Sequence, residues 1–438
     1  MTDQVPALAI TGRTAVSIAA DLRALIERGV LATGDALPPV RALADEIGVN
    51  RNTVVAAYRQ LAQAGLVASR GRGGTRVTGV SSVPEEGFAP ASDLRDVAAG
   101  NPDPSLIPDA SAALTGIVGR PVLYGEPVID AGLEEWAGAW MGPDVPAGFR
   151  LTITNGSFDA VERLLAQALA RDDAVAVEDP GFLATIRTVR LAGYRPIAVA
   201  VDGEGMTPDG LRAALEAGAR AVVVTPRAQN PTGATLTERR ASELRDVLAD
   251  HPYALVIADD HFSLLSHAPY RSLVGPGHRR YALVRSVSKF LGPDMSLAIV
   301  ASDEHTAARL AERLSPGTTW VSHLLQRLAH AQLAGSGGEI AAAGDHYARR
   351  NAAFAAALAE RGIAAEPGEG LTVWVDVGRP ADAVAGALAR RGWRARPGDE
   401  FRVADRDPSR HLRITAHRLS DAEQGALADA LRDAIDAV

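Results

Sequence analysis

The segment Ser286-Val287-Ser288-Lys289-Phe290-Leu291-Gly292-Pro293 holds the only lysine of the chain and is the strongest indication of its fold. The other 44 basic residues, histidine aside, are arginines. A guanidinium stays protonated and cannot condense with an aldehyde, whereas a desolvated lysine amine can form a Schiff base. A bias toward arginine explains the arginines, but it does not explain why the lysine follows a strand-like run at 281–284. The pattern indicates a lysine that holds a cofactor covalently.

Composition limits the class of protein. At 438 residues, with 47% hydrophobic and 22% charged residues, the chain has the size of two or three globular domains. It has no cysteine, which excludes disulfides, thiolate zinc sites and thiol nucleophiles, and no metal site is expected. No secretory signal is visible, and no apolar run is long enough to cross a bilayer. We therefore expect a cytoplasmic protein that does not enter the membrane.

The charge of the chain is unevenly distributed. Residues 1–80 contain nine arginines and six acidic residues, an excess of three positive charges. The overall charge is −8, so the remainder carries −11. A small basic region joined to an acidic body is typical of a nucleic-acid-binding domain fused to a second function.

The basic region reads as three helices and a hairpin. Apolar spacing predicts a helix at 15–27, a second from Pro38-Pro39 through Ile47, and a third from Arg51 to about Ala64. Two alternating runs, at 66–69 and 75–78, form the hairpin. Two helices joined by a short turn, followed by a basic wing, predict a winged helix-turn-helix that binds DNA. The alternative is a small helical domain with surface arginines.

This region resembles the winged-helix domain of GntR-type bacterial regulators over about residues 12–79, through Leu37-Pro38-Pro39-Val40-Arg41-Ala42-Leu43-Ala44, Val49-Asn50-Arg51-Asn52-Thr53-Val54, Tyr58, Leu61 and Gly65-Leu66-Val67. Val55 stands where some members have another basic contact. The resemblance and the basic wing tip imply operator contacts by seven residues: Arg41, Asn50, Arg51, Asn52, Thr53, Arg70 and Arg72. We place this domain at 1–79, followed by a Pro- and Ser-containing linker at 80–94.

The remaining residues, 95–438, alternate short apolar strands with amphipathic helices. Seven strands are expected, at 151–154, 174–177, 197–201, 221–225, 254–258, 281–284 and 297–301. Apolar strands separated by helices predict a large, mainly parallel α/β/α lobe, at about 95–340. Further strands at 371–375 and 411–415 predict a smaller C-terminal α+β lobe, at about 341–438.

Unusual residues follow several of these strands, where parallel sheets bind ligands. Gly156-Ser157 begins a helix and suits an anion. Phe182 can place a ring over a heterocycle, although ordinary core packing explains it equally well. Asn230 lies in a turn where it can meet a phenolate oxygen. Asp259, the first of two aspartates, can keep a pyridine nitrogen protonated, although capping explains an acidic pair equally well.

Taken in order with Lys289, these motifs resemble the fold-type I, class I/II aminotransferases, which bind pyridoxal 5′-phosphate (PLP). The resemblance implies that Lys289 forms the PLP Schiff base, that Asp259 pairs with the pyridine nitrogen, and that Asn230 contacts the ring hydroxyl. It also implies that Phe182 stacks on the ring. Four residues would hold the phosphate: Gly156, Ser157, Phe158 and Ser286. Tyr124 would reach the phosphate of a neighbouring subunit, which implies a homodimer, and Arg413 would bind a substrate or effector carboxylate.

The chain departs from that family in two places. Members usually carry a phosphate-binding arginine seven or eight residues after the lysine, where this chain has Ser296 and Leu297. His261 stands where a tyrosine helps to hold the ring hydroxyl. Losing one charge-assisted contact costs about 1.5–3 kcal/mol, or one to two decades of affinity. Arg227 and Arg285 are the candidates to replace the missing arginine.

A GntR-like domain fused to an aminotransferase-like body resembles the MocR group of bacterial regulators. This implies a dimeric regulator that binds double-stranded operator DNA and senses PLP or its adduct with an amino compound. His261 and the region 320–323 resemble members tied to vitamin B6 metabolism, which suggests its target genes. One alternative is an active aminotransferase that carries a DNA-binding head. Another is a degenerate body that serves only for dimerisation.

Overall fold

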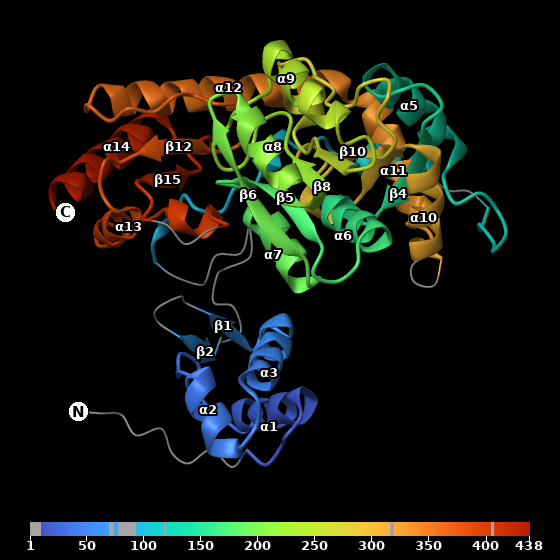
Figure 1. Cartoon of the computed structure of the whole chain (residues 1–438). Helices are drawn as coiled ribbons and strands as arrows, with labels where there is room; N and C mark the ends of the chain where they lie inside the picture. The colour runs from blue at the N-terminus through green and yellow to red at the C-terminus, as the bar shows by residue number, and fades with distance from the viewer. Residues whose placement is uncertain (1–9, 70–73, 78–92, 118–119, 316–318, 404–406) are drawn as a thin grey trace. The chain divides into compact units, whose positions relative to one another are not determined.

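The computed structural model describes residues 10–69, 74–77, 93–117, 120–315, 319–403 and 407–438. Contacts divide the chain into two units, Met1–Pro84 and Glu85–Val438, which we call the head and the body (Figure 1). Most of the predicted linker lies outside the described residues, so the domain boundaries given above stay a prediction. None of the described helices is long and apolar enough to cross a membrane.

The head consists of three helices and a two-stranded antiparallel sheet. Their bounds are α1 Ala15–Glu27, α2 Val40–Ile47, α3 Arg51–Gln63, β1 Val67–Ser69 and β2 Thr75–Val77.

Local chemistry fixes where these helices begin and end. Thr14 and Ser17 form a capping box at the start of α1. Gly48, with a φ of 66°, ends α2 in the left-handed conformation. Asn50 then caps α3, because its side chain accepts a hydrogen bond from the Asn52 N–H at 2.8 Å. The sequence therefore predicted these helices closely, since their end signals are local.

The large lobe of the body is built on one eight-stranded sheet. Its strands are β4 Arg150–Thr154, β5 Ala174–Asp179, β6 Arg195–Asp202, β7 Gly205–Met206, β8 Ala219–Val224, β9 Leu255–Asp259, β10 Tyr281–Ser286 and β11 Ala298–Ser302. Their order is β4-β11-β10-β9-β8-β5-β6-β7. Only β7 and β11 run antiparallel to their neighbours, which confirms a mainly parallel sheet.

Helices cover both faces of this sheet. The strands carry apolar side chains on both faces, so each face is buried against helices. One buried cluster joins the sheet to α6 Gly156–Ala168, α7 Leu183–Leu191 and α10 Glu304–Leu314. The opposite cluster joins it to α5 Ala131–Met141, α8 Pro208–Glu216, α9 Glu238–Ala249, α11 His323–Gly335 and α12 Gly337–Ala359. A short helix, α4 Ser111–Gly116, contacts α11. The result is the three-layer α/β/α lobe seen in Figure 1.

The small lobe is an α+β unit, as predicted. A three-stranded antiparallel sheet has the order β12-β15-β14, and a parallel pair joins β3 to β13. The bounds are β3 Arg95–Asp96, β12 Val373–Asp376, β13 Trp393–Arg394, β14 Arg396–Pro397 and β15 His411–Ile414, with α13 Ala381–Ala389 and α14 Asp421–Asp436. Val97 and Phe354 lie in the same buried core. The residues that follow the predicted linker, at 95–97, therefore pack in the small lobe.

Candidate effector site and nucleic-acid interface

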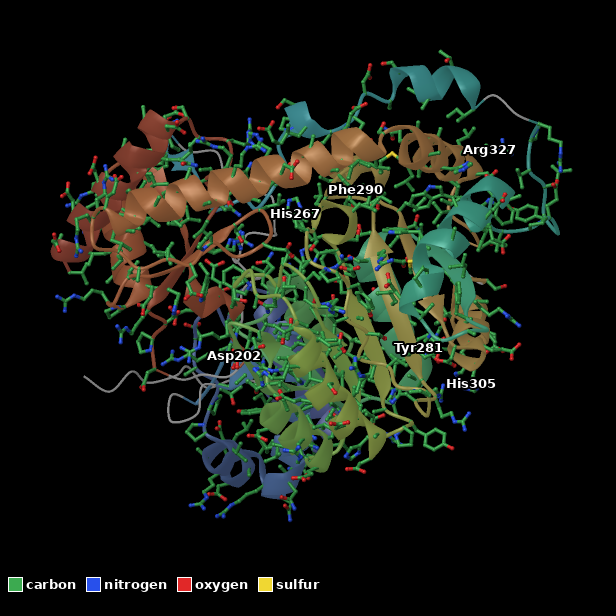
Figure 2. The ribbon with its side chains drawn as sticks, turned by 90° about the horizontal axis from the view of Figure 1, so that it is seen from above. Asp202, His267, Tyr281, Phe290, His305 and Arg327 are labelled. Carbon is green, nitrogen blue, oxygen red and sulfur yellow. The ribbon has the colours of Figure 1, made fainter. Side chains whose placement is uncertain are left out.

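The predicted cofactor residues gather at one edge of the large sheet. Strands β4, β9 and β10 are parallel, so their carboxyl ends meet there. The register aligns Ser286 with Ala298 of β11, and Ala298 with Thr154 at the end of β4. Figure 2 labels Tyr281, where β10 begins, and Phe290, in the loop just after it ends. Lys289 lies in that loop, beside the strand ends.

Lys289 is half-buried, and its amine contacts the main chain of Gly100, near the start of the body. Its Nζ donates to the carbonyl oxygen of Gly100 at 3.3 Å. The register pairs Asp259, at the end of β9, with Val284 of β10, so Asp259 and His261 lie beside the loop that carries Lys289, and the positive charge of Lys289 acts on the pKa of both groups. The structure therefore brings three of the predicted cofactor residues together.

Asp259 ends β9 as a buried carboxyl group. Burial, with the neighbouring charge of Asp260, raises its pKa to about 7, and Lys289 only partly opposes this. Its Oδ1 atom is buried and makes no hydrogen bond within the described residues. Leaving such an oxygen without a partner costs about 1–3 kcal/mol. A protonated ring nitrogen is the kind of partner that this oxygen fits.

His261 follows two residues later and is held neutral. Burial lowers its pKa to about 4, and the positive charge of Lys289 adds to the effect. A neutral imidazole can donate one hydrogen bond and accept another. At neutral pH this histidine can thus serve as a hydrogen-bond partner without adding a charge to the site.

Asn230 and Arg413 lie in contact. The Nη1 of Arg413, on β15, donates to the Oδ1 of Asn230 at 3.1 Å, and its Nη2 donates to the carbonyl oxygen of Ala98 at 2.5 Å. The guanidinium carbon lies 4.9 Å from the centre of the Phe401 ring. Arg413 is fully buried, so a carboxylate that reaches it would be bound away from water.

A buried glutamate supports the loop that carries Asn230. The Oε1 of Glu178 accepts a hydrogen bond from the Thr225 N–H, and its Oε2 accepts one from Nε2 of Gln229, both at 3.1 Å. Burial raises the pKa of Glu178 to about 7, although these hydrogen bonds oppose the rise. Sequence reasoning missed this residue, because one acid at a strand end carries no distinctive signal.

The predicted phosphate residues surround the start of α6. Gly156 has a φ of +83°, a conformation that favours glycine, and Ser157 beside it is buried. Ser286 donates its hydroxyl to Ser288 Oγ at 3.1 Å and accepts the Ser288 N–H at 3.2 Å. The Ser296 hydroxyl lies 3.6 Å from where a Cβ on Gly156 would be. A neutral hydroxyl therefore lies by the predicted phosphate site, at a position where the resemblance led us to expect an arginine.

The remaining predicted cofactor residues are aromatic. Phe158 and Phe182 form a stacked pair, with ring centres 5.5 Å apart and 24° between planes. Tyr124 is 87% exposed, and its ring lies 5.3 Å from that of Trp320. An exposed tyrosine can reach another chain, but its role there stays a prediction.

Arg227 and Arg285 do not replace the missing phosphate arginine. Arg227 donates Nε and Nη2 to Asp260 at 2.9 and 2.5 Å, and Arg285 donates Nε to Asp260 at 2.8 Å. Arg285 also pairs with Asp144 at 2.5 Å. Burial alone would raise the pKa of Asp260, but the two guanidiniums hold it below its ordinary value. The expectation was wrong because both arginines are committed to the second aspartate.

The predicted DNA contacts that fall on described residues lie at the amino ends of α2 and α3. Four of them are exposed: Arg41, Asn50, Arg51 and Asn52. Thr53 is half-buried. The amino end of a recognition helix is where base edges are read in helix-turn-helix proteins. Arg70 and Arg72 lie outside the described residues.

Two family models match the chain. Residues 98–431 match aminotransferase class I and II, and residues 14–77 match bacterial regulatory proteins of the gntR family. The chain belongs to the class I and II aminotransferase family by its body, and its head is a GntR-type DNA-binding domain. Together these domains make it a transcriptional regulator of the MocR type.

Three relatives with the names of transcriptional regulators align with more than half of the chain. The "Vitamin B6 salvage pathway transcriptional repressor PtsJ" of Salmonella typhimurium is 45% identical over 430 residues, 98% of this chain and 100% of the relative. The "HTH-type pyridoxine biosynthesis transcriptional regulator PdxR" of Corynebacterium glutamicum is 26% identical over 310 residues, 66% of each chain. The "Probable rhizopine catabolism regulatory protein MocR" of Rhizobium meliloti is 26% identical over 55% of each chain.

Solved structures confirm the fold of the body. A kynurenine aminotransferase from Pyrococcus horikoshii, crystallised with PMP, superposes with a TM-score of 0.71 at 22% identity, over 79% of this chain and 91% of that one. LysN, an α-aminoadipate aminotransferase from Thermus thermophilus, has a TM-score of 0.70 at 22% identity, over 79% and 93%. These similarities establish fold-type I architecture for the body.

Proposed function

We propose that this regulator binds PLP covalently through Lys289, and that the bound cofactor changes its affinity for operator DNA. The fit of the site supports this. The partnerless Oδ1 of Asp259 suits a protonated pyridine nitrogen, and the glycine-led start of α6 suits a phosphate. Bound PLP supplies an aldehyde that condenses with amines and a ring that withdraws electrons.

In this proposal each part of the cofactor is bound by different residues of the site. Lys289 holds it covalently, Asp259 pairs with the ring nitrogen, and Asn230 and His261 meet the ring hydroxyl. Phe182 packs on the ring. Gly156, Ser157, Phe158 and Ser286 hold the phosphate, and Tyr124 reaches the phosphate of a second copy, so the working form is a homodimer. Arg413 receives the carboxylate of an amino-compound effector.

One observation favours sensing over turnover as the purpose of this site. Lys289 and Arg413 both donate hydrogen bonds to carbonyl oxygens of one short segment, at Gly100 and Ala98. This segment is the start of the body, and the chain leads back from it through the linker to the head. A ligand that uses the Lys289 amine or the Arg413 guanidinium therefore competes with bonds that hold this segment.

The loss of these bonds gives the ligand a physical effect on the segment. An amine that is bonded to the cofactor has at most one proton left to donate, and a guanidinium that faces a carboxylate turns donors away from Ala98. A hydrogen bond to a charged group contributes about 1.5–3 kcal/mol. Other bonds keep the segment in the body, among them Gly100 N–H to Thr415 Oγ1 at 3.0 Å. The ligand thus loosens the segment without detaching it.

The missing phosphate arginine supports the same purpose. Ser296 offers a neutral hydroxyl where the family has a guanidinium, so the phosphate loses a charge-assisted contact. A sensor needs an affinity near the cellular concentration of its ligand, whereas an enzyme gains from permanent occupancy. The names of two relatives, one in vitamin B6 salvage and one in pyridoxine biosynthesis, support vitamin B6 genes as the target.

A second candidate is an active aminotransferase that carries a DNA-binding head. It is favoured by the retention of Asp259, Lys289 and Arg413, which permits transfer of an amino group to and from PLP. Steady-state turnover of an amino donor and a keto acceptor at roughly 1 s⁻¹ or more would establish it. Turnover far below that rate, with PLP bound, favours the sensor.

Hydrogen–deuterium exchange on full-length protein tests the proposed function. We expect PLP to produce a visible absorbance band in the wild type but not in Lys289→Ala, and to speed exchange in residues 94–103. The control peptide is β8, which lies inside the sheet and should not change. A band with unchanged exchange would refute signalling through this segment. No band would refute the cofactor and leave a body that serves only for dimerisation.

A further inference from the structure

A cleft between the two lobes of the body is lined by none of the residues proposed to hold PLP. Its cavity volume is about 860 Å³, in the range of small-molecule sites, and ligands commonly bind between lobes. The large lobe contributes Pro180, Val201 and the loop 232–235, and the small lobe contributes Trp374 and residues 364–369. Neither Lys289 nor Asp259 lines this cleft.

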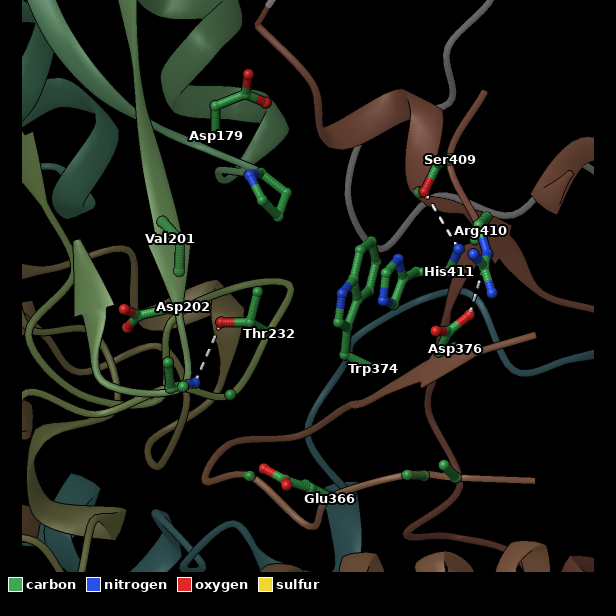
Figure 3. A pocket seen from close by; sticks show the side chains of 18 of the residues that line it. Asp179, Val201, Asp202, Thr232, Glu366, Trp374, Asp376, Ser409, Arg410 and His411 are labelled. Carbon is green, nitrogen blue, oxygen red and sulfur yellow. Dashed lines mark hydrogen bonds and ion pairs between the residues drawn. The ribbon is translucent and has the colours of Figure 1, made fainter. Parts of the chain in front are cut away.

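Trp374, on β12, forms an aromatic wall of the cleft. Its ring stacks on that of His411 with centres 5.0 Å apart and 3° between planes. Burial lowers the pKa of His411, so this ring is neutral at neutral pH. In Figure 3 His411 lies against one side of Trp374, and Thr232 and Val201 of the large lobe lie across the cleft on its other side. The indole therefore has one face available for a flat ring.

The charge of the lining favours a cation. Six carboxylates line the cleft against two guanidiniums: Asp179, Asp202, Glu366, Glu369, Asp376 and Asp407, with Arg402 and Arg410. Both arginines lie beside an acid, since Arg402 is 3.8 Å from Asp399 and Arg410 is 3.8 Å from Asp376. Arg240, outside the lining, pairs with Asp202 at 2.8 Å, so the excess of negative charge comes from the other carboxylates. Glu366 is exposed in the lining. A phosphate would meet net repulsion here, whereas an ammonium group would be attracted.

We propose that this cleft is a second ligand site, which binds a small planar ring that carries a protonated amine and no phosphate. The ring lies on the free face of Trp374, and the ammonium group lies toward Glu366. Stacking on indole and cation–π attraction provide the binding energy. This proposal rests on the proposed function for its regulatory role. It adds a second effector, an aromatic amine without a phosphate.

The site is connected to Arg413, the proposed carboxylate ligand, through contacts between aromatic rings. Trp374 meets Phe401 edge-on, with centres 5.8 Å apart and 86° between planes, and the Arg413 guanidinium lies over the same Phe401 ring. Two rings, those of Trp374 and Phe401, would thus separate the ligand from Arg413. Because both lobes line the cleft, a bound ring also favours the lobe separation that accommodates it.

Calorimetric titration with pyridoxamine tests the site, with pyridoxine, which has a hydroxyl group in place of the amine, as its match. PLP is first fixed on Lys289 of the full-length protein by borohydride reduction, so that the probe cannot enter the cofactor site. We expect one pyridoxamine per chain. Glu366→Gln should weaken pyridoxamine about two- to fivefold and leave pyridoxine unchanged. Trp374→Leu should weaken both about tenfold.

Glu360→Gln is the matched control, because Glu360 is an exposed acid outside the cleft, and it should change neither affinity. If the reduced protein binds no pyridoxamine, or if Glu366→Gln leaves the affinity for pyridoxamine unchanged, the site is refuted. Glu366→Gln decides the question even if Trp374→Leu fails to fold. Failure of the proposed function appears separately as absent cofactor absorbance. In that event the titration is made on Lys289→Ala, with the same expectations.

Discussion

The buried ion pairs around Asp260 give a prediction whose size follows from the structure. Asp260 is completely buried next to Asp259 of the proposed cofactor site and accepts three hydrogen bonds from Arg227 and Arg285. Asp260→Asn keeps the shape of the side chain but removes its charge. Two buried guanidiniums then lose the carboxylate that neutralises them.

The structure limits the size of the loss. Removing one partner of a buried ion pair costs about 3–5 kcal/mol. Arg285 keeps Asp144 and Arg227 keeps the carbonyl oxygen of Ala268, so neither guanidinium is left without an acceptor. We therefore expect a loss near the lower end, about 3 kcal/mol of unfolding free energy. Asp259 also loses a neighbouring negative charge, so its pKa should fall.

Urea unfolding followed by tryptophan fluorescence measures this loss in the full-length protein. All five tryptophans lie in the body, so the signal reports the body alone. Asp209→Asn is the matched control, because that aspartate pairs with Arg212 at the surface with a 97% exposed side chain. It should cost less than about 0.5 kcal/mol. A loss below about 1 kcal/mol in Asp260→Asn would show that the ion pairs do not stabilise the body.

Three further predictions concern the head and the buried carboxyl groups. Asn50→Ala removes the cap of α3, about 1 kcal/mol, so exchange of the α3 amides should quicken about fivefold; unchanged exchange would contradict the cap. Arg51→Ala should weaken operator binding about tenfold in a mobility shift, whereas the exposed Arg23→Ala on α1 should not; equal losses would contradict the interface. The pKa of Glu178 is raised in the folded protein, so this glutamate makes a contribution to stability that is fully present below about pH 4.5, its ordinary pKa. That contribution is lost as the pH rises to about 7. If the unfolding free energy of the wild type stays constant over this pH range, as in Glu178→Gln, the prediction is contradicted.

How far the sequence could predict the fold depended on the range of the interactions. The helix at Ala15–Glu27 was predicted with its observed bounds, because apolar residues at helical spacing are a local signal. The large-lobe strands were found because a strand buried on both faces is a continuous apolar run. The two-residue strands β3 and β13 were missed, since their pairing joins residues about 300 positions apart.

The candidate site shows the same limit. The residue types after the strands identified Asp259, Asn230 and Lys289 as one group, and the structure brings them to one edge of the sheet. The sequence could not assign Arg285, because only strand alternation and packing direct it to Asp260. It also could not show that Lys289 and Arg413 bond to the main chain at Gly100 and Ala98. Every residue has a backbone carbonyl, so the sequence does not indicate which of them accepts a hydrogen bond from a side chain.

The most direct test of the central claim is operator binding by the full-length protein, with and without PLP, in the wild type and in Lys289→Ala. A mobility shift on DNA from upstream of the protein's own gene provides the measurement. We predict that PLP changes the wild-type affinity by at least about fivefold, the lower range of allosteric coupling, and leaves Lys289→Ala unchanged. The same affinity in all four conditions, or an equal change in both proteins, would contradict control through Lys289.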